Sequence, residues 1–190
     1  MVSPETTSGP RAEARRYVLC AAARALAEDP QASIQDIAVA SGVGRATVYR
    51  WFACREQLIE AIHAEVAAQA DEIVLSRLAE GGPALERLLR VSRDIIALGD
   101  TYRFLAAQGE MRKARRSGAA TDALETHIAR AQRAGELRSD LPAEWLSATF
   151  SGLLATACRE LSRGDAAREQ VAEMVGRTIT AAFAPLSASS

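Results

Sequence analysis

Apolar residues recur at helical spacing along almost the whole chain. Near the N-terminal end, Val18, Ala22 and Leu26 lie on one stripe, and Ile34 and Ile37 begin a second one. Spacings of three and four residues are typical of amphipathic helices, and no segment alternates apolar and polar residues for long enough to form a sheet. The pattern therefore predicts an all-α protein.

Glycine and proline interrupt these apolar repeats and mark the ends of the expected helices. Gly42 ends one helix, Gly81 to Pro83 break another, and Gly135 ends a third, because glycine tolerates a left-handed turn and proline cannot continue a helix. About nine helices are expected in total. After residue 52 they cover 55 to about 78, 84–98, 101–116, 121–134, about 143–163 and about 166–183.

The segment from residue 33 to residue 52, SIQDIAVASGVGRATVYRWF, predicts a helix-turn-helix. Ser33 can accept hydrogen bonds from the free N–H groups of a first helix, and Asp36 places a carboxylate at its positive end. Gly42 permits the sharp turn that follows. On the second helix, Val48 and Phe52 fall on the side that faces the core.

The opposite side of that second helix carries side chains suited to DNA. Arginine can pair with guanine, Thr and Tyr hydroxyls can bind phosphate oxygens, and Ala leaves room for a thymine methyl group. An ordinary helical hairpin, with Tyr49 and Trp51 as packing residues, is the alternative. Tyr49, Arg50 and Trp51 are consecutive, however, so a helix cannot bury all three. The residues expected on this side are Arg45, Ala46, Thr47, Tyr49 and Arg50.

Together these residues resemble the DNA-binding domain of the tetracycline-repressor (TetR) family of bacterial transcription regulators. The resemblance covers about residues 11 to 65. It rests on four motifs: Ser-Ile-x-Asp-Ile-Ala from Ser33, Ser-Gly-Val from Ser41, Thr-Val-Tyr-x-x-Phe from Thr47 and Arg-Glu-x-Leu from Arg55. The chain departs from the family at residues 29–31, where a glycine and an aromatic are usual, and at Cys54, where a capping residue is usual.

The resemblance also implies which residues bind DNA. Ser33, Thr47, Tyr49 and Arg55 are expected to contact phosphates, while Arg45, Ala46 and Arg50 are expected to lie nearest the base edges. By this reasoning, loss of Arg55 weakens binding to every sequence and reduces its salt dependence, whereas loss of Arg50 relaxes the preference for particular base pairs. The full expected set is Ser33, Gly44, Arg45, Ala46, Thr47, Tyr49, Arg50 and Arg55.

The function that the resemblance implies is that of a dimeric, sequence-specific transcriptional regulator. It is expected to be a repressor, released from a palindromic operator in double-stranded DNA when a small-molecule effector of unknown identity binds the C-terminal domain. The alternative is a helical protein-interaction or ligand-carrier protein that does not read DNA. The expected domains are a disordered tail (residues 1–10), a helix-turn-helix DNA-binding domain (11–60) and a regulatory and dimerisation domain (61–185).

The last two helices, about 143–163 and 166–183, are expected to form the homodimer interface. No residue between Glu144 and Arg159 is charged, so that helix must be covered on more than one side. Ala148, Gly152 and Ala155 lie about a turn apart and permit close helix approach. Pairing with the same helices of a second copy satisfies both features, and an intramolecular core is the alternative.

A ligand pocket is expected in the C-terminal domain, although aromatics and Met at helical spacing also fit a plain core. No metal site or cofactor is expected, because His127 has no histidine or cysteine near it in sequence. The candidate pocket residues are Tyr102, Phe104, Met111, His127, Trp145 and Phe150.

Composition and the absence of certain motifs limit the classes of protein to which the chain could belong. The 190 residues carry a formal net charge of −1, and residues 1–63 contain seven arginines and seven acidic residues, so any DNA affinity depends on where the arginines lie. The three cysteines lack the spacing of a zinc site or a disulfide scaffold. Neither a signal peptide nor a membrane segment is evident, and motifs of catalysis are missing. We therefore expect a cytoplasmic protein that is not an enzyme.

Overall fold

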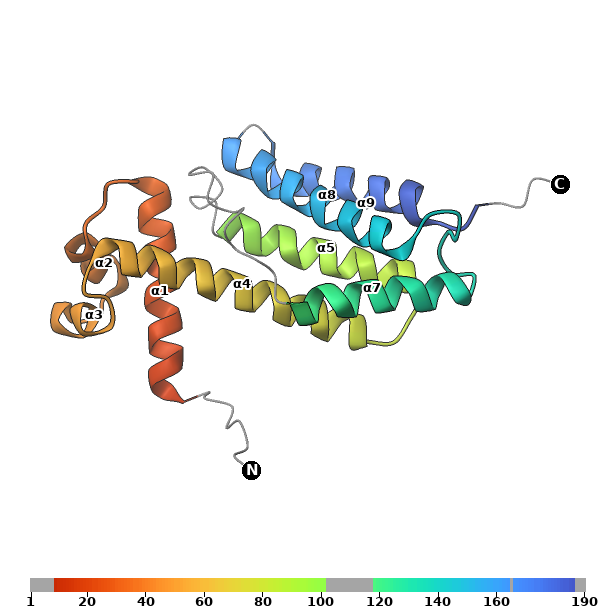
Figure 1. Ribbon diagram of the computed structural model, residues 1–190. Coiled ribbons are helices and arrows are strands. Elements are labelled where there is room, and N and C mark those ends of the chain that lie inside the picture. Colours follow the sequence, from red (N-terminus) through yellow and green to blue (C-terminus); the bar gives the residue numbers. More distant parts are fainter. Residues whose placement is uncertain (1–8, 102–117, 165, 187–190) are drawn as a thin grey trace, which may run out of the picture. The chain divides into compact units, whose positions relative to one another are not determined.

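The computed structural model describes residues 9–101, 118–164 and 166–186 (Figure 1). These residues form eight α-helices and no strand, which confirms the predicted all-α fold. The helix expected over residues 101–116 lies almost wholly outside the described residues. The chain divides into two compact units with their boundary between Glu65 and Val66, and each unit is described by itself.

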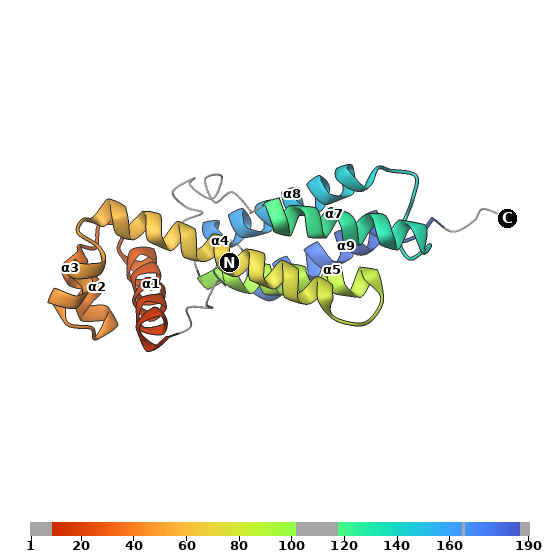
Figure 2. The same cartoon turned by 60° about the horizontal axis from the view of Figure 1, so that its bottom comes forward.

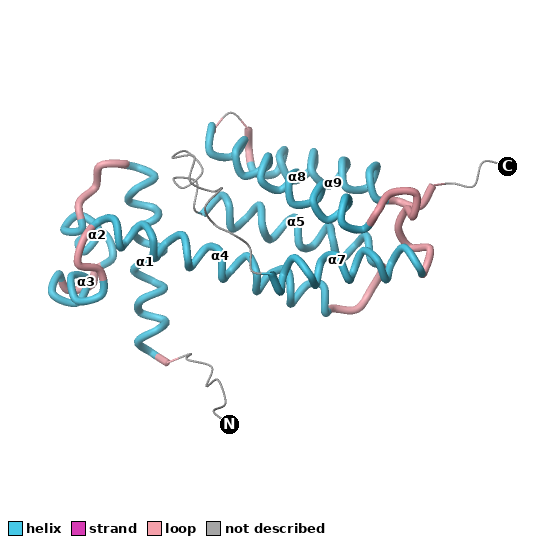
Figure 3. Tube along the Cα trace, viewed as in Figure 1, coloured by secondary structure: helices cyan, strands magenta, loops and turns pink. Residues whose placement is uncertain are grey.

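The first unit contains a small helical bundle. It is built from α1 (Pro10–Glu28), α2 (Ile34–Ser41), α3 (Arg45–Trp51) and the beginning of α4 (Arg55–Ala79). Short loops join these helices (Figure 3), and α2 packs against both α1 and α3. Burial follows the apolar repeats of the sequence, so the same spacing that predicts the helices also builds the core. The fully buried side chains include Val18, Leu19, Leu26, Ile37, Val48, Leu58 and Ile62.

The second unit is a larger helical bundle. It contains the rest of α4 together with α5 (Ala84–Thr101), α7 (Gly118–Arg133), α8 (Ala143–Arg163) and α9 (Arg168–Phe183). Helices α5, α8 and α9 lie side by side, with α7 against α8 (Figure 2). Phe150 of α8 meets Phe183 of α9 edge to face, with ring centroids 6.1 Å apart. This pair lies in the core shared by the five helices.

Gly99 allows α5 and α8 to approach closely. A Cβ atom at Gly99 would lie 2.6 Å from the Sγ of Cys158, which is well inside van der Waals contact. Burial raises the pKa of the Cys158 thiol to about 11. The thiol is therefore protonated at ordinary pH and packs as a small apolar side chain.

Candidate nucleic-acid interface

Helix α2 begins at a reciprocal cap. The hydroxyl of Ser33 accepts a hydrogen bond from the backbone N–H of Asp36 at 3.2 Å. In return, Asp36 Oδ2 accepts from the backbone N–H of Ser33 at 2.9 Å and from its hydroxyl at 2.6 Å. The hydrogen bonds from Ser33, first from its side chain and then from its backbone, lower the pKa of Asp36. A carboxylate therefore occupies the positive end of α2.

The turn between α2 and α3 is held by local hydrogen bonds. Gly42 ends α2 with φ of 64°, in the left-handed region, and its N–H donates to the carbonyl of Val39 at 3.1 Å. The buried hydroxyl of Ser41 donates to the carbonyl of Ala38 at 3.1 Å and accepts from the N–H of Val43 at 3.4 Å. These bonds fix the direction in which α3 leaves the turn.

Helix α3 presents one side to the core and the other to solvent. Val48 is fully buried, and Phe52, at the end of the helix, is 1 % exposed. These two residues lie on the core side, as their spacing predicts. Tyr49 is 48 % exposed, and Trp51 is half-buried. The predicted DNA-binding residues Gly44, Arg45, Ala46, Tyr49 and Arg50 are exposed, and Thr47 is half-buried.

Arg55, the first residue of α4, points toward a different part of the unit. It is half-buried, and its Nη2 donates to the backbone carbonyl of Pro30 at 2.5 Å. Pro30 lies in the connection between α1 and α2. The family resemblance implied a phosphate contact for Arg55, and the sequence gave no sign of this bond, because the two residues are 25 positions apart.

The junction between α3 and α4 contains two further contacts that the sequence did not reveal. The guanidinium of Arg15, on α1, lies 5.2 Å from the centroid of the Phe52 ring. The side-chain oxygen of Gln57 accepts from the backbone N–H of Ala53 at 3.1 Å. Gln57 thus contributes a capping bond where Cys54 replaces the usual capping residue.

The candidate ligand residues that the structure describes lie in three different settings. Phe150 is fully buried in the core, whereas Trp145 is 63 % exposed on α8. His127 is buried, with its Nε2 3.3 Å from the carbonyl oxygen of Ala84, and its pKa is lowered, chiefly by burial. These three residues are not brought together around one cavity described here. Tyr102, Phe104 and Met111 lie outside the described residues.

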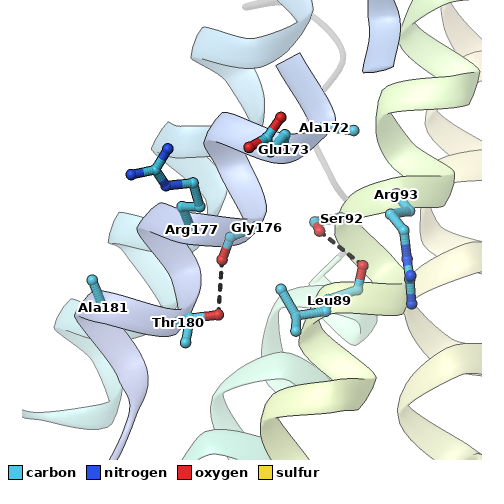
Figure 4. A pocket seen from close by; sticks show the side chains of 9 residues that line it. All are labelled: Leu89, Ser92, Arg93, Ala172, Glu173, Gly176, Arg177, Thr180 and Ala181. Atoms are coloured by element: carbon cyan, nitrogen blue, oxygen red, sulfur yellow. Dashed lines mark hydrogen bonds between the residues drawn. The ribbon is translucent and has the colours of Figure 1, made fainter. Parts of the chain in front are cut away.

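A groove runs between α5 and α9 in the second unit, and it has a cavity volume of about 570 Å³ (Figure 4). Its hydroxyl groups are turned to the backbone, since Ser92 donates to the carbonyl of Leu89 and Thr180 to that of Gly176. Of the candidate ligand residues that the structure describes, His127, Trp145 and Phe150, none lines this groove. The lining residues are Leu89, Ser92, Arg93, Ala172, Glu173, Gly176, Arg177, Thr180 and Ala181.

Small and apolar side chains are exposed on both α8 and α9 in the described part of the chain. Along α8, Trp145, Ala148, Gly152 and Ala155 are exposed, and a Cβ atom at Gly152 would meet nothing within 4 Å. On α9, Met174 is 53 % exposed. Among the described residues, no group of three metal-ligating side chains is found, and no helix has the length and apolar character needed to cross a bilayer.

The capped α2, the fixed turn and the outward side of α3 define a helix-turn-helix DNA-binding protein. Residues 18–62 match the sequence model of a family described as bacterial regulatory proteins, tetR family. Residues 18–62 therefore carry a domain that matches this family, and the rest of the chain is similar to regulators named as its members.

Named regulators and solved structures of regulators are also similar to this chain over most of its length. The chain is 29 % identical to the HTH-type transcriptional repressor LfrR of Mycolicibacterium smegmatis over 98 % of each sequence. It is similar to the crystal structure of LfrR from Mycobacterium smegmatis in complex with proflavine, with a TM-score of 0.65, 26 % identity and coverage of 90 % of this chain and 97 % of that one. A TetR-family regulator from Rhodococcus sp. shares the fold, with a TM-score of 0.68, 21 % identity and coverage of 89 % and 98 %.

Proposed function

We propose that this protein is a homodimeric repressor that binds a palindromic operator through α3 and leaves it when a small molecule binds the second unit. The exposed, donor-rich side of α3 is the observation that carries the proposal. Two findings on one relative, LfrR, support its regulatory part. It is named a transcriptional repressor, and a structure of LfrR contains proflavine. The proposal assigns no catalytic reaction to the chain and places its action in the cytoplasm.

In this proposal the residues of α3 divide into two roles. Arg45, Ala46 and Arg50 lie against base edges in the major groove, where arginine pairs with guanine. Gly44, Thr47 and Tyr49 approach the phosphates, and such contacts fix the register of the helix. Ser33 lies at the same end of the motif, but its N–H and hydroxyl already donate to Asp36. A phosphate contact from Ser33 therefore requires the cap to open.

The homodimer forms through the exposed surface of α8 and α9. Small side chains at Ala148, Gly152 and Ala155 allow the helices of a second copy to approach, and Trp145 and Met174 supply apolar area. Two copies related by a two-fold axis present two α3 helices to successive major grooves. A ligand that binds better to one separation of these helices shifts the equilibrium between bound and free protein.

Selection of bound DNA from a random pool tests the DNA-reading part of the proposal. The purified full-length protein should enrich one sequence that reads the same on both strands, with half-sites about one or two helical turns apart. Enrichment of an asymmetric site would contradict the dimer, and no enrichment over the input pool would contradict DNA reading itself. Titration of proflavine into the complex is a first trial of release, since it is a ligand of known chemistry in a relative.

A further inference from the structure

The start of α4 is joined to the connection between α1 and α2. Arg55 Nη2 donates to the carbonyl of Pro30 at 2.5 Å, while Arg55 Nε is buried and finds no hydrogen-bond partner in the described structure. The connection that receives this bond is itself ordered by short-range bonds. The N–H of Gln31 donates to Asp29 Oδ1 at 2.9 Å, and the N–H of Ala32 donates to the carbonyl of Asp29 at 3.0 Å.

This orientation differs from that of a phosphate contact. A phosphate contact needs guanidinium N–H groups directed to solvent, whereas the Arg55 side chain is half-buried and one η nitrogen is already engaged. A positive charge at the N-terminal end of a helix is also unfavourable, because it meets the positive end of the helix dipole. The Pro30 carbonyl offsets this effect, since it places negative partial charge against the guanidinium.

Two other contacts join α1 to neighbouring parts of the first unit. Arg16 Nε lies 2.8 Å from Glu65 Oε1, and the Arg15 guanidinium lies over the ring of Phe52, just before α4. The first contact connects α4 to α1, and the second connects the end of α3 to α1. The Arg55 bond instead reaches the connection from which α2, and then α3, departs.

We propose that Arg55 is a positioning residue. It couples the start of α4 to the α1–α2 connection, and α3 therefore moves together with α4. This inference rests on the proposed function, because it assumes that the separation of two α3 helices matters. It assigns to Arg55 no contact with phosphate. Its loss should loosen the placement of α3 and leave the number of phosphates neutralised by the protein unchanged.

The two roles predict different measurements. Each phosphate neutralised by a side chain adds about 0.9 to the slope of log K against log salt on duplex DNA. Removal of a phosphate contact lowers that slope, whereas removal of a bond to a backbone carbonyl does not. A loosely held α3 has a different effect. Each α3 can then adjust to half-sites at the wrong separation, so the protein discriminates less between correctly and incorrectly spaced operators.

The experiment uses the full-length protein, the operator found by selection, and the same operator with one or two base pairs added between its half-sites. Affinities are measured between about 50 and 200 mM salt, the range over which phosphate contacts have large effects. Arg55→Ala and the milder Arg55→Gln, which retains part of the stem, are compared with Arg45→Ala, which removes an exposed arginine of α3. Circular dichroism and thermal unfolding establish that each variant is folded.

We expect both Arg55 variants to keep the wild-type slope and to reduce the preference for correct spacing by about tenfold, equivalent to ~1.4 kcal/mol. Arg45→Ala removes an arginine that the proposed function places against a base edge, so it should weaken binding to the operator and keep the spacing preference. If the salt slope of Arg55→Gln falls by about 0.9 for each protomer, the value for one lost phosphate contact, the inference is overturned, even if the spacing preference also changes. An unchanged spacing preference in both Arg55 variants overturns it as well.

Amide hydrogen exchange provides a readout that does not need DNA. The N–H of Ala32, in the connection beside Pro30, should exchange several-fold faster in Arg55→Gln than in wild type, and at the wild-type rate in Arg45→Ala. Equal exchange in all three proteins overturns the inference. A wild-type protein that binds no DNA, together with faster exchange in Arg55→Gln, contradicts the proposed function and leaves the coupling supported.

Discussion

Two of the residues expected to bind phosphate already use hydrogen-bond donors inside the protein. Ser33 donates twice to Asp36, and Arg55 donates to Pro30. Binding of the DNA backbone therefore depends more heavily on Gly44, Thr47 and Tyr49. Residue chemistry alone assigns all of these side chains to DNA, whereas their bonding partners separate those that face outward from those that hold the motif together.

Asp36 places a negative charge at the end of α2 that would otherwise attract a phosphate. Its pKa is lowered by the hydrogen bonds from Ser33, so it stays ionised throughout the neutral range. Asp36→Asn should tighten binding to operator and unrelated duplexes alike, by roughly two- to fivefold, because surface charges act over short range and are screened by salt. Fluorescence anisotropy at two salt concentrations measures this change. Glu72→Gln, the same kind of change in the second unit, should have no effect, and equal results for both variants would refute the argument.

Arg50 is expected to discriminate between bases. A bidentate arginine–guanine pair contributes about 1–3 kcal/mol of discrimination, so Arg50→Ala should reduce the preference at one position of each half-site by about fivefold or more. Affinities for a panel of single-base operator variants would measure this effect. Thr47→Val serves as the comparison, because loss of a phosphate contact lowers the affinity for every operator variant by the same factor. If Arg50→Ala also weakens all variants evenly, Arg50 does not read a base.

At the scale of elements, the sequence predicted what neighbouring residues determine. Three features depend only on residues within about two helical turns of one another: the cap at Ser33, the turn at Gly42 and the inward side of α3. The structure confirms each of them. The bond from Arg55 to Pro30 joins residues that are distant in sequence, so no local pattern could indicate it. Its existence depends on how α1, α2 and α4 pack.

The last helix shows a similar limit. Val171, Met174, Val175, Thr178, Ile179 and Phe183 recur at helical spacing in the sequence, and this spacing alone does not separate core positions from surface positions. In the structure, Val171, Val175, Ile179 and Phe183 are buried, while Met174 and Thr178 are exposed. The candidate ligand residues separated for the same reason, since Phe150 joined the core and Trp145 lies outside it. Packing between helices determines which positions of an apolar stripe are buried. Helical periodicity shows only which positions are candidates for burial.

Gly42 and Gly44 flank the turn and make a matched pair for testing the motif as an element. Gly42 has φ of 64°, whereas Gly44 has φ of −54°, and a Cβ atom at either would meet nothing within 4 Å. Gly42→Ala should lower the free energy of unfolding by about 1 kcal/mol, the cost of a side chain in the left-handed region. Gly44→Ala should leave stability unchanged. Urea denaturation measures both changes.

The same pair separates folding from DNA contact. Gly44 belongs to the proposed interface, so a methyl group there should obstruct close approach of the phosphate backbone and weaken DNA binding without loss of stability. Gly42→Ala, assayed well below its unfolding temperature, should retain more of the wild-type affinity than Gly44→Ala. The opposite order, with Gly44→Ala binding normally, would show that DNA does not approach this end of α3.

At the scale of the whole molecule, the two sides of α8 lack charge for different reasons. Leu146, Phe150 and Leu154 are buried within the bundle of the second unit. Ala148, Gly152 and Ala155 are exposed in the single chain and are small as well as uncharged. Folding of one copy accounts for the first set. The second set makes sense where another helix covers it, and the proposed homodimer supplies that helix.

Gly152→Arg tests the homodimer directly. Gly152 is exposed and a Cβ atom there would meet nothing within 4 Å among the described residues, and arginine is a better helix former than glycine, so the fold of one copy should persist. In the dimer, the same side chain would place a charge between closely packed helices, where burial of an unpaired charge is costly. Light scattering should therefore show a monomer at micromolar concentration, where the wild type is a dimer.

Loss of the dimer should also reduce operator affinity. A monomer binds one half-site at a time, and it lacks the raised effective concentration that holds the second reading helix near its half-site once the first has bound. The affinity for a full operator should fall by about 100-fold or more, toward that for an isolated half-site. Thr121→Arg, at an exposed position on α7, is the control and should change neither mass nor affinity. A Gly152→Arg protein that remains dimeric would place the dimer interface away from this surface of α8, because no close helix contact could contain that side chain.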